Sequence, residues 1–95
     1  MNRVLRPALQ VVELAQRLSP EPRRAVKHAL FGLRAERGDI RALEGALTGY
    51  YRLRVGRFRI IFTYVADGVI EAVFMEERSL VYEVFEAEFL KRLRS

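Results

Sequence analysis

The sequence predicts an α+β fold: an N-terminal helical hairpin packed on a twisted, mainly antiparallel sheet of three to four strands, with a short C-terminal helix. Apolar residues recur at helical spacing over about residues 8–37. Two-residue turn signals then separate alternating segments over 50–75. Hydrophobic residues make up 51% of the 95 residues, and no linker or repeat divides them. We therefore predict one domain spanning 1–95.

The helical hairpin is identified by two apolar stripes separated by Ser19-Pro20-Glu21-Pro22. Ser19 is a suitable N-cap for the second helix. The prolines that follow are tolerated in its first turn, because the N–H groups there lack helical partners. Gly38-Asp39 is expected to close that helix. The stripes consist of Val11, Leu14, Ala15 and Leu18, and of Val26, Ala29, Leu30 and Leu33.

The sheet is expected to contain strands near 50–55, 57–65 and 69–75, joined by Gly56-Arg57 and Asp67-Gly68 turns. A short strand at 3–5 is expected at the edge or beside the centre. Because side chains alternate between faces, one face carries apolar residues toward the helices. We call the other side the arginine face; it carries Arg52, Arg54, Arg59, Ile61 and Thr63.

The arginine face has the composition of a phosphate site. Four arginines and no acid lie between 52 and 59, and the turn places Arg54 opposite Arg59. Like charges directly opposite each other are destabilising by up to about 1 kcal/mol, which an arriving anion relieves. We therefore expect Arg52 and Arg54 to bind phosphate and Arg57, in the turn, to touch it loosely. A solvated sheet face is the alternative.

The overall charge favours a polyanionic partner. The net charge is +5, the pI is about 10.2, and all but two of the 17 basic residues are arginine. Arginine grips phosphate with a planar fork that lysine lacks. A GC-rich genome also enriches arginine, but such a bias does not explain the arrangement at 52–59.

Acidic residues follow the third strand. The register across the Asp67-Gly68 turn places Glu76 opposite Arg59, where its carboxylate is either a general base or an ion-pair partner. Glu77 is expected to be solvated. The segment 83–94 has helical spacing and several acids, and it is a candidate to cover the arginine face, although 80–82 is also compatible with a strand.

Several site classes are not expected. The absence of cysteine excludes disulfides and Cys zinc sites, and His28 falls on an exposed helix position, so no metal or cofactor is expected. The N-terminus has no apolar signal region, and no apolar run approaches the about 18 residues that a membrane span requires. We therefore expect a cytoplasmic protein with no membrane partner.

The order of these motifs resembles the RelE/ParE superfamily of toxins over about residues 8–85. The resemblance is carried by Leu43-Glu44-Gly45, Tyr51-Arg52-Leu53-Arg54-Val55-Gly56, Phe58-Arg59-Ile60-Ile61-Phe62 and Glu77-Arg78-Ser79-Leu80-Val81-Tyr82. It implies a toxin of a type II toxin–antitoxin system with a cognate antitoxin.

The RelE-like branch implies a metal-independent endoribonuclease that cuts mRNA on the ribosome. In that reaction the ribose 2′-OH attacks the adjacent phosphate and the 5′-oxygen leaves. The resemblance assigns the cationic clamp to Arg52, Arg54 and Arg59, charge stabilisation to Arg78, and substrate stacking or proton transfer to Tyr82. Many relatives have a basic residue where this chain has Glu76-Glu77, which lowers the positive potential.

Two alternatives remain open at the level of the sequence. ParE-like members share the fold but poison DNA gyrase by binding alone, and a degenerate member binds its partner without toxicity. Convergence of the motif arginines and Tyr82 on one patch is the feature that a nuclease needs and a gyrase binder does not.

Overall fold

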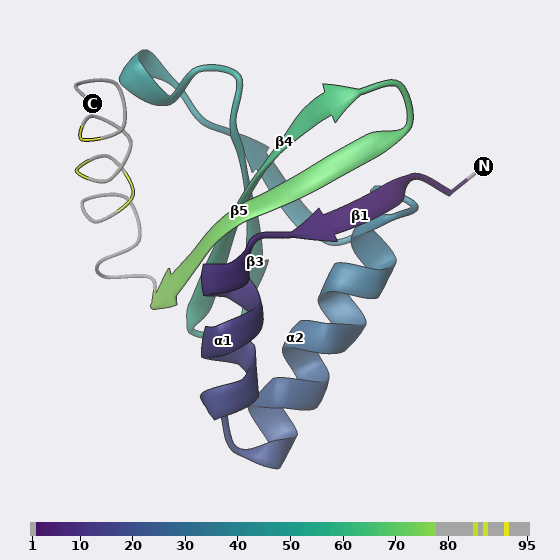
Figure 1. Cartoon of the computed structure of the whole chain (residues 1–95), viewed down its shortest axis with the longest axis vertical. Coiled ribbons are helices and arrows are strands. Elements are labelled where there is room, and N and C mark those ends of the chain that lie inside the picture. The colour runs from purple at the N-terminus through teal and green to yellow at the C-terminus, as the bar shows by residue number, and fades with distance from the viewer. Residues whose placement is uncertain (1, 78–84, 86, 88–90, 92–95) are drawn as a thin grey trace.

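The computed structural model describes residues 2–77 together with 85, 87 and 91. Its strand order is β1-β5-β4-β3-β2, with β1 parallel to β5 and all other pairs antiparallel (Figure 1). The predicted α+β class is confirmed, and the predicted helix at 83–94 lies outside the described residues apart from 85, 87 and 91. The elements are β1 (Val4–Pro7), α1 (Leu9–Arg17), α2 (Pro20–Leu33), β2 (Asp39–Ala42), a 3-10 turn (Gly45–Leu47), β3 (Tyr51–Val55), β4 (Phe58–Ala66) and β5 (Val69–Glu77).

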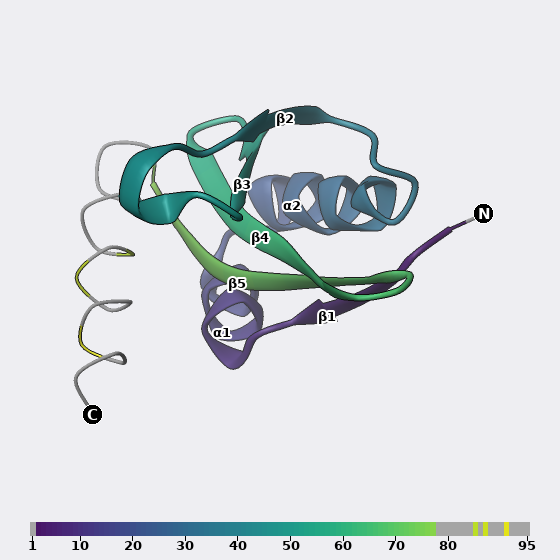
Figure 2. The ribbon, with the colours of Figure 1, turned by 90° about the horizontal axis from the view of Figure 1, so that it is seen from above.

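Both helices pack on one face of the twisted sheet (Figure 2). Val11 of α1 and Val26 and Leu33 of α2 are fully buried against Leu53, Ile60 and other residues of β3, β4 and β5. The predicted assignment of the alternating residues to the two faces is confirmed. A smaller group on the opposite face, the outer cluster, consists of Leu47, Ile61, Phe74 and Phe85.

The sheet has five strands, so the prediction of three to four was wrong. The missed strand is β2, a four-residue edge strand with no fully buried residue. Its Asp39 and Ala42 have low strand propensity. The strand forms because it pairs with β3, and the local sequence does not indicate this pairing. The expected N-terminal strand is confirmed as β1, at the edge of the sheet.

The end of α2 also differs from the prediction. The helix ends at Leu33, and its last turn is closed by bonds from the Glu36 N–H to the Leu33 carbonyl (2.8 Å) and from the Arg37 N–H to the Gly32 carbonyl (3.1 Å). This is the bonding pattern of a Schellman motif, with Glu36 in the left-handed conformation at φ 55°. The left-handed residue of the motif that closes α2 is therefore Glu36, where the sequence predicted Gly38. Ser19 occupies the predicted N-cap position, but its side chain makes no capping hydrogen bond.

Tertiary contacts hold Glu36 in this unusual conformation. Its carboxylate accepts hydrogen bonds from the Tyr64 hydroxyl (2.7 Å) and from Arg3 Nε (3.2 Å), and the Arg3 guanidinium lies 5.0 Å from the centre of the Tyr64 ring. The Tyr64 hydrogen bond, followed by that from Arg3, lowers the pKa of Glu36. Burial, followed by the bond to Glu36, raises the pKa of Tyr64 to about 12. The cluster joins β1, the end of α2 and β4.

A side chain of α1 extends the hydrogen bonding of β5 beyond the end of β1. The ladder with β1 reaches Ala72, whose carbonyl accepts from the Ala8 N–H (2.8 Å). Farther along β5, the Gln10 side-chain amide donates to the Met75 carbonyl (2.7 Å) and accepts from the Met75 N–H (2.8 Å). Gln10 thus takes the place of a neighbouring strand just before Glu76.

Candidate functional site: the arginine face

The β3–β4 hairpin has the predicted geometry. Val55 pairs with Phe58 and Arg54 with Arg59 across the Gly56-Arg57 turn, and Gly56 has a φ of 58° that an L side chain rarely adopts. Arg54 and Arg59 are therefore direct cross-strand neighbours on the face opposite the helices.

Glu76 lies opposite Arg59, as predicted, but the ladder between β4 and β5 is not regular. Register shifts occur between Tyr64 and Ala66 and between Ile61 and Phe62. The first leaves an extra residue on β4 and the second an extra residue on β5, so the two cancel before the ladder reaches Arg59. The Glu76 carboxylate accepts a hydrogen bond from the Glu77 N–H at 3.2 Å.

Strand β2 brings two charged residues to this face that the sequence did not identify. Asp39 pairs with Arg54, and Arg41 pairs with Arg52. Asp39, Arg54, Arg59 and Glu76 consequently form one row across four strands, with an acid at each end. The alternation of Asp39 and Arg41 around Ile40 was a weak signal for a strand.

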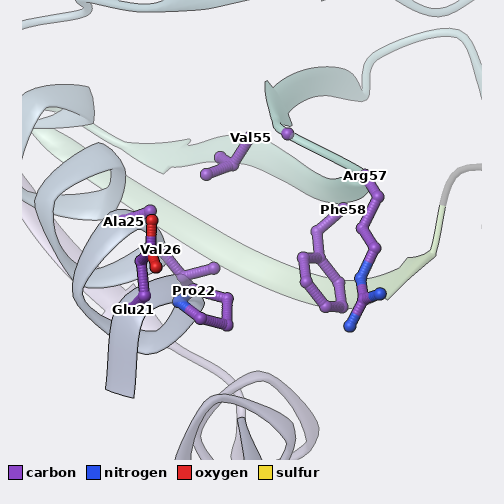
Figure 3. Close-up of a pocket in the computed structure, with 8 residues that line it drawn as sticks. Glu21, Pro22, Ala25, Val26, Val55, Arg57 and Phe58 are labelled. Atoms are coloured by element: carbon purple, nitrogen blue, oxygen red, sulfur yellow. The ribbon is translucent and has the colours of Figure 1, made fainter. Parts of the chain in front are cut away.

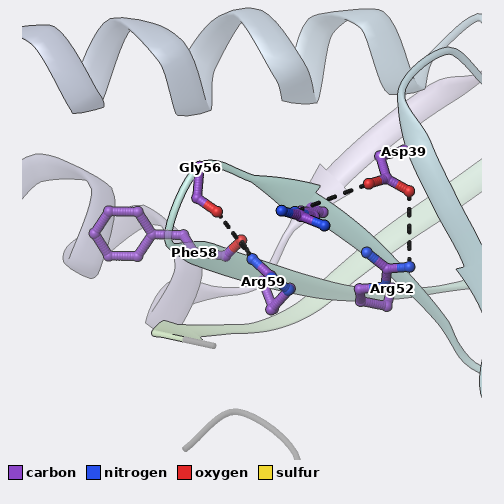
Figure 4. Close-up of polar contacts among 6 residues, drawn as sticks. Asp39, Arg52, Gly56, Phe58 and Arg59 are labelled. Atoms are coloured by element: carbon purple, nitrogen blue, oxygen red, sulfur yellow. Dashed lines mark hydrogen bonds and ion pairs between the residues drawn. The ribbon is translucent and has the colours of Figure 1, made fainter. Parts of the chain in front are cut away.

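Two arginines of the predicted cationic clamp are buried. Arg52 and Arg59 are each 8% exposed. Arg59 donates from one terminal nitrogen to the carbonyl oxygens of Gly56 and Phe58, both at 3.0 Å (Figure 4). The Arg59 side chain therefore stabilises the Gly56-Arg57 turn.

Asp39 contacts both arginines of β3. Its two carboxylate oxygens lie 3.7 Å from a terminal nitrogen of Arg52 and 4.0 Å from Nε of Arg54 (Figure 4). Half of the Arg54 side chain remains exposed. Exposed ion pairs contribute about 0–1 kcal/mol, so Asp39 restrains Arg54 only weakly.

Arg57 turns away from this face. Its guanidinium lies 5.2 Å from the centre of the Phe58 ring, and both residues line a cleft of about 470 Å³ between the hairpin tip and the start of α2 (Figure 3). Glu21 and Pro22 of α2 form the opposite wall. Arg57 is exposed, but it does not join the row of Arg54 and Arg59.

The remaining predicted site residues, Arg78 and Tyr82, lie outside the described residues. Among the residues that the structure describes, no group of three or more His, Cys, Asp or Glu side chains is arranged to hold a metal ion. Within the same residues, no helix combines the length and apolar character needed to span a membrane. His28 is exposed, as predicted.

The outer cluster borders the arginines. Phe85 packs at 5.2 Å from the ring centre of Tyr50 and at 5.9 Å from that of Phe74. It is 6% exposed. Residue 85 of the predicted C-terminal segment therefore lies against the face that also carries Arg52 and Arg59.

The fold has clear counterparts among solved structures. The RelBE2 toxin–antitoxin complex of Mycobacterium tuberculosis contains a chain with a TM-score of 0.72 and 20% identity, covering 82% of this chain and all of that one. The archaeal RelE–RelB complex of Pyrococcus horikoshii matches with a TM-score of 0.67 and 29% identity over 82% of this chain and 97% of that one. This chain therefore has the fold of the RelE/ParE toxins.

The similarity extends to other branches of the superfamily. A YoeB/ParE toxin from Agrobacterium tumefaciens matches with a TM-score of 0.66 and 14% identity, over 79% of this chain and 98% of that one. No protein-family model and no curated protein matches the sequence. The likeness to the RelE/ParE toxins is therefore one of three-dimensional structure, and the fold agrees with the one that the motifs predict.

Proposed function

We propose that this chain is the toxin of a type II toxin–antitoxin system and that it cleaves mRNA, on the ribosome, without a metal ion. The observation that carries the proposal is the gathering of Arg52, Arg54 and Arg59 on one sheet face in a fold shared with RelE toxins. Their position on one face agrees with a nuclease, and the full criterion also requires Arg78 and Tyr82, which lie outside the described residues.

In the proposed reaction the 2′-oxygen attacks the adjacent phosphorus, the bond to the 5′-oxygen breaks, and a proton passes to the leaving oxygen. Arginine guanidiniums stabilise the charge that develops on the crowded phosphate. Arg54 is exposed enough to meet the substrate, whereas Arg59 is held by its turn. We assign charge stabilisation to Arg59 and Arg78, and substrate stacking or proton transfer to Tyr82.

Glu76 is the candidate base for the 2′-OH. It lies opposite Arg59 and is half-buried, and a carboxylate in this position can accept the proton of the 2′-OH. The competing role, neutralisation of Arg59, predicts that Glu76→Gln raises RNA affinity without abolishing cleavage. A base predicts loss of cleavage with retained affinity.

A cognate antitoxin is the second proposed partner, since the matched structures include toxin–antitoxin complexes. An apolar cleft of about 350 Å³ runs between α1 and α2, lined by Val12, Ala15 and Leu30 and bordered by Arg23 and Lys27. An acidic amphipathic helix complements this surface or the arginine face. A structure of the complex in which the partner touches neither surface would contradict this assignment.

The activity is tested by primer extension on mRNA after the purified protein is added to a translating cell-free extract, with naked RNA as the control. We expect cuts only during translation. Arg59→Ala and Arg78→Ala should each reduce cleavage by about 100-fold, the loss typical of one missing transition-state donor. Arg24→Ala, at an exposed position on α2, should cleave normally.

The fold of each variant is checked by urea unfolding, because Arg59 also bonds its turn. Arg59→Lys keeps the charge and loses the fork, so it separates the electrostatic role from the structural one. Wild-type cleavage by the alanine variants would refute their assigned roles. If the mRNA stays intact and the protein inhibits supercoiling by DNA gyrase, the nuclease proposal is wrong and the protein is a gyrase inhibitor.

A further inference from the structure

Strand β2 widens the positively charged surface beyond the hairpin. Its Arg41 is the register partner of Arg52, and paired residues of adjacent antiparallel strands project from the same face of the sheet. Arg41 therefore lies on the arginine face at the outer edge of the sheet. It is separated in sequence from the 52–59 motif by the Gly45–Leu47 turn.

Arg41 and Arg52 differ in their surroundings. Arg52 is buried and has Asp39 as an ion-pair partner, whereas Arg41 is exposed. Among the described residues, no ion pair involves Arg41. Two arginines in direct register repel each other by a few tenths to about 1 kcal/mol, and only one of them is compensated.

The carboxylate of Asp39 does not neutralise this corner of the sheet. Asp39 follows the alternation of β2 onto the same face, but its two oxygens are directed at Arg52 and Arg54. One negative charge, on Asp39, is thus shared by Arg52 and Arg54, and Arg41 adds a third positive charge to this corner. Within β2 and β3, Arg41 and the half-exposed Arg54 are the exposed arginines.

We propose that Arg41 binds a backbone phosphate of the RNA and that the RNA-binding surface extends across β3 to the edge strand β2. This inference rests on the proposed ribonuclease function and names a contact for that same site. Asp39 competes with the RNA for Arg52 and Arg54, its two ion-pair partners, and leaves Arg41 to the ligand.

The alternative reading is that Arg41 merely protects an edge strand. Charged side chains on edge strands prevent pairing with other chains, and a charge of either sign serves that purpose. Phosphate binding requires a positive charge. Arg41→Lys and Arg41→Glu therefore separate the two roles, since both keep a charge at the edge and only the first keeps its sign.

The test measures binding of a short single-stranded 2′-O-methyl RNA, which lacks the attacking hydroxyl, as a function of salt concentration. For single strands, each phosphate contact contributes about 0.7 to the slope of log K against log salt. We expect Arg41→Ala to lower that slope by about 0.7 and Arg41→Lys to restore it. Arg24→Ala, on the helical side of the sheet, should leave it unchanged.

Further results decide the proposal. Asp39→Asn should tighten RNA binding, because it removes the acid that competes for Arg52 and Arg54. A wild-type slope in Arg41→Ala, or equal binding by Arg41→Glu and Arg41→Lys, would overturn the role of Arg41 while RNA binding by the wild type leaves the nuclease proposal intact. If Arg41→Ala weakens only antitoxin binding, the surface is a protein interface and the RNA assignment is wrong. Failure of the wild type to bind this RNA would also overturn the Arg41 contact, whereas the proposed function is tested separately by cleavage in the translating extract.

Discussion

The bond pair between Gln10 and Met75 offers a quantitative test of how α1 supports the site. Gln10→Ala removes both the donor to the Met75 carbonyl and the acceptor from the Met75 N–H, at part-buried positions. A typical hydrogen bond contributes about 0.5–1.5 kcal/mol net, and two such bonds give about 2 kcal/mol. For a domain of this size, that loss lowers the melting temperature by roughly 10 °C.

The assay is urea unfolding followed by circular dichroism, with Gln16→Ala as the control because Gln16 is exposed on the same helix. Gln10→Glu gives a sharper test. Its ionised carboxylate keeps the bond from the Met75 N–H but repels the Met75 carbonyl, whereas the protonated acid donates as the amide does. Folding then raises the pKa of the new carboxyl, so the deficit relative to wild type should shrink as pH falls toward about 4.3 and stay constant below that value.

Two outcomes would refute this account of Gln10. One is a Gln10→Ala variant as stable as Gln16→Ala, which would mean that water replaces the side chain at Met75 without cost. The other is a Gln10→Glu deficit that does not change with pH. Because Glu76 follows Met75 directly, a confirmed loss also predicts weaker cleavage at temperatures where the variant remains folded.

Two more predictions concern the backbone and the Tyr64 cluster. Gly38→Ala should lower the free energy of unfolding in urea by about 2–4 kcal/mol, since Gly38 has φ 123° and an added Cβ would lie 2.7 Å from Leu53 Cδ1. The control is Gly49→Ala, at φ 100° with no atom within 4 Å of the added Cβ, which has the backbone strain alone and should lose less stability. Equal losses in the two variants would exclude the steric explanation. The raised pKa of Tyr64 means that its protonated form stabilises the fold, fully below about pH 10 and less as pH rises through about 12. Tyr64→Phe should therefore lose less stability than wild type between these pH values, and parallel pH profiles of the two proteins would contradict the role of the hydroxyl bond to Glu36.

The parts of the fold that the sequence predicted are those determined by local patterns. The Gly56-Arg57 turn set the register of Arg54 and Arg59, and the apolar stripes placed both helices on the correct face. Strand β2 could not be predicted because its four residues acquire a ladder only when β3 lies beside them. The pairing of Glu76 with Arg59 was correct even though two register shifts, invisible in the sequence, had to cancel.

The end of α2 shows why a glycine rule failed. Gly38 is the residue that a sequence reading chooses for a left-handed helix end, and the left-handed conformation costs a non-glycine residue about 1–2 kcal/mol. Glu36 adopts it because Arg3 and Tyr64, from distant parts of the chain, bind its carboxylate. Such compensation is tertiary, and no window of sequence around Glu36 contains it.

The charges of the arginine face change the argument for a phosphate site. From the sequence, repulsion between Arg54 and Arg59 indicated an anion. In the structure, Asp39 and Glu76 stand at the two ends of the same row, so the protein itself supplies acids to offset a repulsion of at most about 1 kcal/mol. The repulsion alone therefore no longer requires a ligand. Exposed positive charge without an ion pair among the described residues, as at Arg41, is the stronger indication of an anionic ligand. A nuclease whose RNA contacts were confined to the 52–59 hairpin would be indifferent to the charge of β2, and the salt dependence of Arg41→Ala measures this directly.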